Sequence, residues 1–148
     1  MSLTPIDQAF EILLGSLTSI DESESVSLID CTGRVLAKDL ESPVNVPPLT
    51  NSAMDGYAVR TIDLADEQTL LTVTQRIAAG EIGSSLAVGE AARIFTGAPI
   101  PEGADAVVVQ ENCEAENNSV KVLQNPARGE NLRETGEDIK AGATLLKV

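Results

Sequence analysis

The sequence predicts a mainly β protein with one N-terminal helix and a β-barrel or sandwich-like unit in its middle part. Three observations support this fold class. Apolar residues repeat with helical spacing only within the first 20 residues. From Ser23 onward, short β-branched or aliphatic runs alternate with Gly, Pro, Asn and Asp, a pattern typical of a small all-β domain. The prolines between residues 43 and 48 and Gly142 bracket a middle segment, residues 43–142, that we expect to be the compact unit.

The predicted helix covers about four turns at the start of the chain. Its apolar positions form one continuous stripe, because they recur at intervals of three and four residues. Thr4 is the expected N-cap, Pro5 the first helical residue, and Asp7 suits the positive end of the helix dipole. The stripe consists of Ile6, Ala9, Phe10, Leu13, Leu14, Leu17 and Ile20.

Eight short runs are predicted to be strands, and Asn117-Asn118 is predicted to be a hairpin turn because Asn tolerates positive φ. The flanks of the middle segment look like parts of another structure. Because the sequence stops inside a predicted strand, we also expect a truncated chain. The predicted strands are Ser25–Ile29, Val35–Leu40, Tyr57–Arg60, Leu70–Arg76, Ala91–Phe95, Ala106–Gln110, Val120–Leu123 and Thr144–Val148.

Composition excludes several classes of function. The 148 residues carry a formal charge of −13, which repels nucleic-acid phosphates and anionic lipid surfaces. The sequence has no apolar run of about 20 residues that could span a membrane, so we expect a cytoplasmic protein without nucleic-acid or membrane partners. The absence of histidine excludes Ser-His-Asp triads and His-ligated zinc. Cys31 and Cys113 form no C-x-x-C pair and are expected to be buried thiols.

Three segments are richer in polar and glycine residues than a simple fold requires. In the first, Asn51–Ala58, Asp55 is followed by Gly56 and could project into a cleft as an oxygen ligand for Mg²⁺. An ordinary Asp-Gly turn is the alternative. In the second, residues 95–108, Thr96 offers a hydroxyl and the amides of Gly97 and Ala98 could meet a ligand. Its alternative is a proline-stiffened connection with Asp105 capping the next strand.

The third segment, Gly129–Ile139, contains Arg133, which could hold an anion. Glu137 or Asp138 could bind a cation or orient that arginine. A solvated cluster of surface salt bridges is the alternative, and taken alone the segment favours it. None of the three segments identifies a function by itself.

Together, and in this order, the three segments resemble the MoeA/gephyrin-E-type molybdopterin molybdenumtransferases. The N-terminal helix, Ala78-Ala79-Gly80-Glu81 and Gly89-Glu90-Ala91 are similar to that family at the corresponding places, so the resemblance covers nearly the whole chain. One departure is Thr50, where the family often has an acidic residue. This departure puts only a secondary carboxylate in doubt.

The resemblance implies a domain organisation and a larger protein. Residues 1–20 would pack on a large α/β domain that follows in the family, residues 21–42 and 143–148 would belong to a small flanking domain, and 43–142 would be a β-rich domain inserted into it. The full-length protein would be an elongated homodimer. Molybdopterin adenylyltransferase and proteins of molybdoenzyme maturation are further expected partners.

The implied reaction inserts molybdate into adenylylated molybdopterin in a Mg²⁺-dependent step that releases AMP, at a cleft completed by the other subunit. By motif match, Asp55, Thr96 and Asp138 are the principal functional residues. The weaker candidates are Ser52, Gly97 and Arg133 for substrate and Glu137, beside Asp55 and Asp138, for the metal.

The remaining alternatives belong to other classes of function. We expect this chain alone to be inactive, because a −13 chain needs cations from elsewhere to hold anionic substrates. A non-catalytic binding or scaffolding module is the main alternative, and a stand-alone molybdate or divalent-ion binder is a third. The sequence does not distinguish molybdenum from tungsten.

Overall fold

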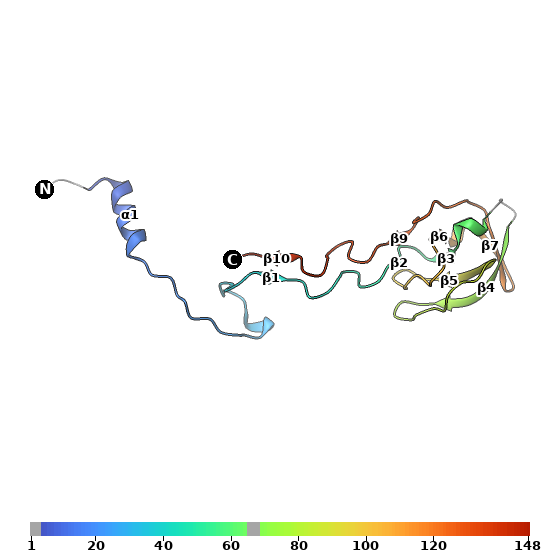
Figure 1. Cartoon of the computed structure of the whole chain (residues 1–148), viewed down its shortest axis with the longest axis horizontal. Coiled ribbons are helices and arrows are strands. Elements are labelled where there is room, and N and C mark those ends of the chain that lie inside the picture. Colours follow the sequence, from blue (N-terminus) through green and yellow to red (C-terminus); the bar gives the residue numbers. More distant parts are fainter. Residues whose placement is uncertain (1–3, 65–68) are drawn as a thin grey trace. The chain divides into compact units, whose positions relative to one another are not determined.

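The computed structural model describes residues 4–64 and 69–148, which fall into two compact units. One unit runs to Lys38 and includes Val148, and the other is Asp39–Lys147 (Figure 1). Each unit is described by itself. The domain boundaries inferred from the resemblance stay predictions.

The first unit contains the predicted helix, α1 (Ile6–Ser16), and a 3-10 turn, η1 (Leu28–Asp30). The helix is shorter than expected at both ends: its N-cap is Pro5 rather than Thr4, and no side chain caps it. The backbone becomes extended at Leu17. Gly15 and Ser16 are weak helix formers, and the Ser16 hydroxyl donates to the carbonyl of Leu13, which competes with continued helix.

No residue of α1 is buried. Phe10 and Leu13 on its apolar stripe are 61% and 64% exposed, so no part of the described chain covers these side chains. The predicted strand Ser25–Ile29 is wrong, since Leu28–Asp30 is a 3-10 turn. Of the predicted strand Val35–Leu40, only Leu40 belongs to a strand, β1 (Leu40–Glu41).

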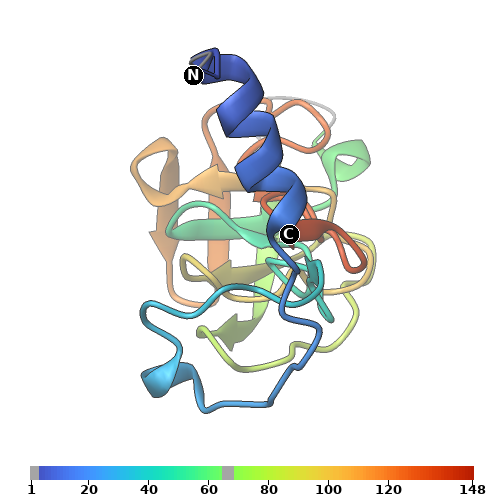
Figure 2. The ribbon, with the colours of Figure 1, turned by 90° about the vertical axis from the view of Figure 1, so that its left-hand side faces the viewer.

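The second unit is built on a six-stranded sheet with strand order β6-β3-β5-β4-β8-β7. β4 and β5 are parallel, and the other neighbours are antiparallel. Viewed in Figure 2, the strands curl into a curved wall, which confirms the mainly β class with a barrel-like domain. The strands are β3 (Gly56–Val59), β4 (Leu70–Ile77), β5 (Glu90–Ile94), β6 (Ala106–Val109), β7 (Cys113–Glu116) and β8 (Ser119–Val122).

Alternation along the strands fills a core on each face of this sheet. Tyr57 and Val59 of β3 belong to one cluster, which also contains Leu71 and Val120, whereas Ala58 belongs to the cluster on the other face. The Asn117-Asn118 hairpin is confirmed: Asn117 has φ 55° and the turn joins β7 to β8. β7 itself was not among the predicted strands.

Two short ladders join the chain segments that lead into and out of this sheet (Figure 1). β1 (Leu40–Glu41) pairs with β10 (Thr144–Leu146), and β2 (Asn51–Ser52) pairs with β9 (Leu132–Arg133), both antiparallel. Between them, the amide of Val46 donates to the carbonyl of Ile139 at 2.7 Å. The two segments therefore run side by side over most of their length.

The other sequence predictions about burial and membranes have mixed outcomes. Cys31 is exposed and Cys113 is half-buried, so the prediction of two buried thiols is wrong. Neither forms a disulfide. Within the part of the chain that the structure describes, no helix is long and apolar enough to cross a membrane.

Candidate functional site

Asp55 and Thr96 form a hydrogen-bonded pair at one end of the six-stranded sheet. Asp55 directly precedes β3 and Thr96 follows β5, and these strands are paired with Gly56 opposite Ile94. This register brings the two residues together. The Oδ1 atom of Asp55 accepts hydrogen bonds from both the backbone amide and the hydroxyl of Thr96, each at 2.8 Å.

These contacts change the acidity of Asp55. The Thr96 amide, followed by the Thr96 hydroxyl, holds the pKa of the Asp55 carboxyl below its usual value, and the charge of Arg93 acts in the same direction. Asp55 is therefore a carboxylate at neutral pH. Among the described residues, its Oδ2 atom receives no hydrogen bond, so this oxygen can meet a ligand.

The backbone amides of the loop after β5 are not free to bind a ligand, which corrects the prediction. The Gly97 amide donates to the carbonyl of Ser52 at 2.8 Å, and the Ala98 amide donates to Phe95. Thr96 uses its amide for Asp55. These three amides are therefore engaged within the chain, and the Gly97 amide attaches the loop to β2.

The side chain of Ser52 is buried and supports the local backbone. It is 1% exposed, and its hydroxyl donates to the carbonyl of Met54 at 2.6 Å. This placement does not favour Ser52 as a substrate contact. Asp105 likewise stabilises a turn rather than capping the strand that follows it: its two oxygens accept from the amide and the hydroxyl of Thr61.

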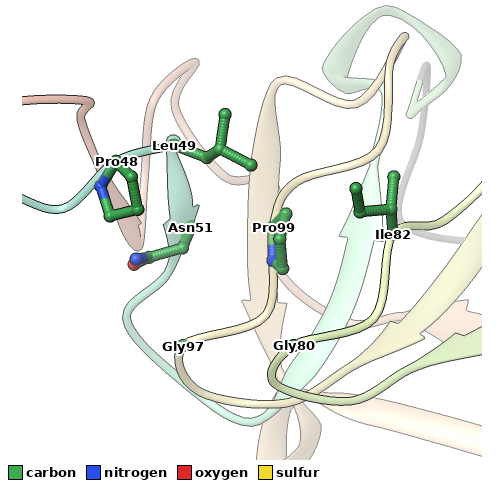
Figure 3. A pocket seen from close by; sticks show the side chains of 7 residues that line it. All are labelled: Pro48, Leu49, Asn51, Gly80, Ile82, Gly97 and Pro99. Atoms are coloured by element: carbon green, nitrogen blue, oxygen red, sulfur yellow. The ribbon is translucent and has the colours of Figure 1, made fainter.

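A shallow hollow of about 300 Å³ opens beside this loop (Figure 3). Its walls come from three segments that are far apart in the sequence, namely residues 48–51, 80–82 and 97–99. In Figure 3 the side chain of Ile82 lies across from that of Asn51, with Pro99 between them. The lining is mostly apolar, so this hollow suits the body of a ligand better than its charged groups.

Arg133 is held by two carboxylates. Its Nη2 atom donates to both oxygens of Asp138 at 2.6 Å, and its Nε atom lies 3.5 Å from Oε1 of Glu137. The hydrogen bonds to Asp138 are the main reason that the pKa of Arg133 is raised. Of the two roles predicted for these acids, orientation of the arginine is the one that the contacts support.

The structure thus brings the three polar segments of the sequence together through β2. Asn51 pairs with Arg133 in the β2–β9 ladder, the amide of Ala53 donates to Asn131, and Ser52 contacts the loop that contains Thr96. The segment of residues 51–55 therefore runs between the Asp55–Thr96 pair and the arginine cluster. The roles assigned to these residues in the reaction stay predictions.

The acidic residues do not form a complete metal site on their own. Within residues 4–64 and 69–148, no group of three or more His, Cys, Asp or Glu side chains could hold a metal ion. Asp55 fits as one ligand because it has an open oxygen, whereas Asp138 and Glu137 are engaged with Arg133. The described residues therefore do not bring Asp55, Asp138 and Glu137 together as three ligands of one metal ion.

Comparison with known proteins identifies the family. The model of the MoeA N-terminal region (domain I and II) matches residues 4–148. The chain belongs to the MoeA N-terminal family. It is 38% identical over 143 residues to a molybdopterin molybdenumtransferase of Haemophilus influenzae, covering 96% of this chain and 35% of that protein. A protein of the same name from Nostoc is 42% identical over 139 residues, with 90% and 32% covered.

A solved structure of a MoeA family member agrees with the fold. The molybdopterin biosynthesis moeA protein of Pyrococcus horikoshii matches with a TM-score of 0.89 and 36% identity, covering 99% of this chain and 40% of that one. The chain therefore spans about a third of the length of the curated MoeA relatives it matches. The resemblance read from the sequence is confirmed at the level of the family and the fold.

Proposed function

We propose that this MoeA N-terminal chain supplies one wall of the active site of a molybdopterin molybdenumtransferase. Family membership and the names of the relatives support a role in molybdenum cofactor biosynthesis. The finer proposal is that molybdate is inserted into adenylylated molybdopterin with release of AMP. The observation that carries it is the Asp55–Thr96 pair, an exposed carboxylate with one oxygen fixed and one oxygen open.

In this proposal the residues of the chain position groups rather than complete the chemistry. Thr96 fixes the direction of the Asp55 carboxylate through two hydrogen bonds, and its own hydroxyl oxygen keeps lone pairs that can accept from a ligand. Asp55 would supply one oxygen to Mg²⁺, which neutralises phosphate charge when bound. Asp138 would act through Arg133, whose orientation it sets.

The rest of the site belongs to parts beyond this chain. A formal charge of −13 does not favour anionic substrates, so we propose that further cations come from the remaining two thirds of the protein in a homodimer. The exposed stripe of α1 would pack on that remaining part. Molybdopterin adenylyltransferase and molybdoenzyme-maturation proteins remain proposed partners, and the cytoplasm the proposed location.

The test is Asp55→Asn in the longer protein that the relatives' length predicts. Asparagine keeps a carbonyl oxygen that accepts both Thr96 hydrogen bonds but removes the charge. We expect loss of Mg²⁺-dependent AMP release of at least about 100-fold, in the range found when one hydrogen-bond donor to a transition state is removed, in a variant that still folds. Glu114→Gln, an equal charge change on the exposed edge strand β7, is the matched control.

Other outcomes would favour the alternatives. If the chain is only a scaffolding module, Asp55→Asn in the longer protein should change neither turnover nor partner binding. A stand-alone ion binder requires this chain alone to bind Mg²⁺ or molybdate tightly in a calorimetric titration. AMP release by the chain alone would contradict the proposal that the site needs the remaining part.

A further inference from the structure

A stack of two arginines and one phenylalanine lies next to the Asp55–Thr96 pair and was not predicted from the sequence. The guanidinium carbons of Arg76 and Arg93 each lie 4.3 Å from the centroid of the Phe95 ring. Phe95 is the residue before Thr96, and Arg93 is close enough to lower the pKa of Asp55. The stack is therefore continuous with the proposed site.

Strand register explains why these side chains meet. Arg76 of β4 and Arg93 of β5 are direct partners in the parallel pair. Partners in register lie on the same face of a sheet, and Phe95, two residues after Arg93, points to that face as well. The alternation of Arg93 and Phe95 in the sequence was the available signal, but it has meaning only once β4 is known to be the neighbour of β5.

The two arginines differ from the other arginines of the chain in their partners. Among residues 4–64 and 69–148, ion pairs with carboxylates are formed by Arg34, Arg60, Arg128 and Arg133, and by neither Arg76 nor Arg93. Arg133, the predicted anion contact, forms ion pairs with Glu137 and Asp138, and these two carboxylates offset its attraction for an anion. Arg76 and Arg93 instead place two positive charges next to one another, without such an ion pair among the described residues.

The two arginines also differ from each other. Arg93 donates to the carbonyls of Gly56 and Ile94 and to Gln110, at 2.8, 2.7 and 2.6 Å, so its position is fixed by the ends of the strands. Arg76 is exposed and has the Phe95 ring as its contact. A guanidinium stacked on a ring keeps its N–H groups directed outward in the ring plane, where they can grip an oxyanion by two parallel hydrogen bonds.

We propose that the Arg76–Phe95–Arg93 stack is the contact of this chain for a phosphate-type oxyanion of the substrate. The inference deepens the proposed function and rests on it for the identity of the substrate, although phosphate binding can be measured without turnover. Arg76 is the main phosphate contact, and Arg93 holds Phe95 and adds positive charge. The Oδ2 atom of Asp55, which receives no hydrogen bond from the described residues, is left for a cation, which suits a phosphate bound together with Mg²⁺.

The experiment is a titration of the 148-residue chain with inorganic pyrophosphate, followed by NMR of backbone amides and arginine Nε–Hε groups. We expect shifts at Thr96, Arg76 and Arg93 that weaken with added salt. Arg76→Gln should weaken binding about tenfold, the loss expected for one charge-assisted contact, and Arg76→Lys should weaken it less. Arg128→Gln removes an equal charge at an exposed site and should leave binding unchanged.

Two results would overturn the inference. One is the absence of pyrophosphate-dependent shifts at the stack in the wild-type chain. The other is equal binding by Arg76→Gln and Arg128→Gln while Arg76→Gln lowers the unfolding midpoint, which would make the stack a purely structural contact. If pyrophosphate binds as expected and Asp55→Asn keeps full turnover in the longer protein, the phosphate site stands and the proposed function of Asp55 fails.

Discussion

Substitution of Gly56 by alanine tests whether the close contact between β3 and β6 positions Asp55. A Cβ atom added at Gly56 would lie 2.0 Å from the carbonyl oxygen of Val108 and 2.8 Å from its carbonyl carbon. Ordinary contact begins at 3.4 Å, so the two strands must separate by about 1.4 Å at this point. The obstacle is backbone, which no change of rotamer can move away.

The expected cost follows from this geometry. Overpacking of a core costs about 1–3 kcal/mol when side chains can adjust, so a clash with backbone should cost about 3 kcal/mol. For a domain of this size, about 1 kcal/mol lowers the melting temperature by about 4 °C, which gives a loss of about 12 °C. Because Asp55 is the preceding residue, the same shift should loosen its hydrogen bonds to Thr96.

The assay is urea and thermal unfolding of the wild-type chain and Gly56→Ala, with NMR detection of the Asp55–Thr96 contact. Gly15→Ala is the control, because a Cβ added at Gly15 meets nothing within 4 Å and alanine favours helix. A Gly56→Ala chain that unfolds within about 0.5 kcal/mol of wild type would refute the reasoning, since it would mean that β6 can move away at little cost.

Three further predictions concern acidity, reactivity and the core. In Thr96→Val the Thr96 amide remains but the hydroxyl is lost, so the pKa of Asp55 should rise toward its usual value without reaching it, as followed by carboxyl carbon NMR. A carboxyl whose pKa is lower in the folded than in the unfolded state stabilises the fold at pH values above its unfolded pKa, and this contribution disappears as pH falls through the folded pKa. The free energies of unfolding of wild type and Thr96→Val should therefore differ most near neutral pH and converge in acid. A difference that is the same at all pH values would contradict this. Burial raises the pKa of the Cys113 thiol to about 11 against a smaller lowering by Arg93, so at pH 8 iodoacetamide should modify exposed Cys31 first, and equal labelling by mass spectrometry would count against the packing around Cys113. Leu71→Ala, at a side chain 1% exposed in β4, should cost about 2–5 kcal/mol in urea unfolding, and a cost below about 1 kcal/mol would show that this side of the sheet is not a packed core.

Strands with a long run of alternating residues were predictable from the sequence. The six strands of the sheet include five of the predicted runs: β3 and β6 are apolar and buried along most of their length, whereas β4 and β8 alternate between buried and more exposed residues. β2 and β9 have two residues each and no periodicity to detect. The segment Ser25–Ile29 has the composition of a strand but no partner in the described chain, and pairing rather than propensity decides whether a strand forms.

The candidate site was predictable in its residues and not in its contacts. Asp55 and Thr96 stood out by residue type and by resemblance, and the register of β3 with β5 explains why they meet. The amides of Gly97 and Ala98 were expected to face a ligand, but whether an amide is free depends on which carbonyl lies opposite, here those of Ser52 and Phe95. The sequence allowed Arg133 to be bound either by Asp138 or by an anion, and only the contacts of the folded chain show that Asp138 binds it.

The paired segments that lead into and out of the sheet also constrain the order of folding. Leu40 and Leu146 are partners although about 100 residues separate them, so pairing them first would close a very large loop. Once the sheet has formed, each successive contact, from Ser52–Leu132 outward to Val46–Ile139, closes only a few residues. The contacts between the two segments should therefore form in order from the sheet toward β1 and β10. In pulsed hydrogen exchange, the Val46 amide should gain protection after the amides of β3.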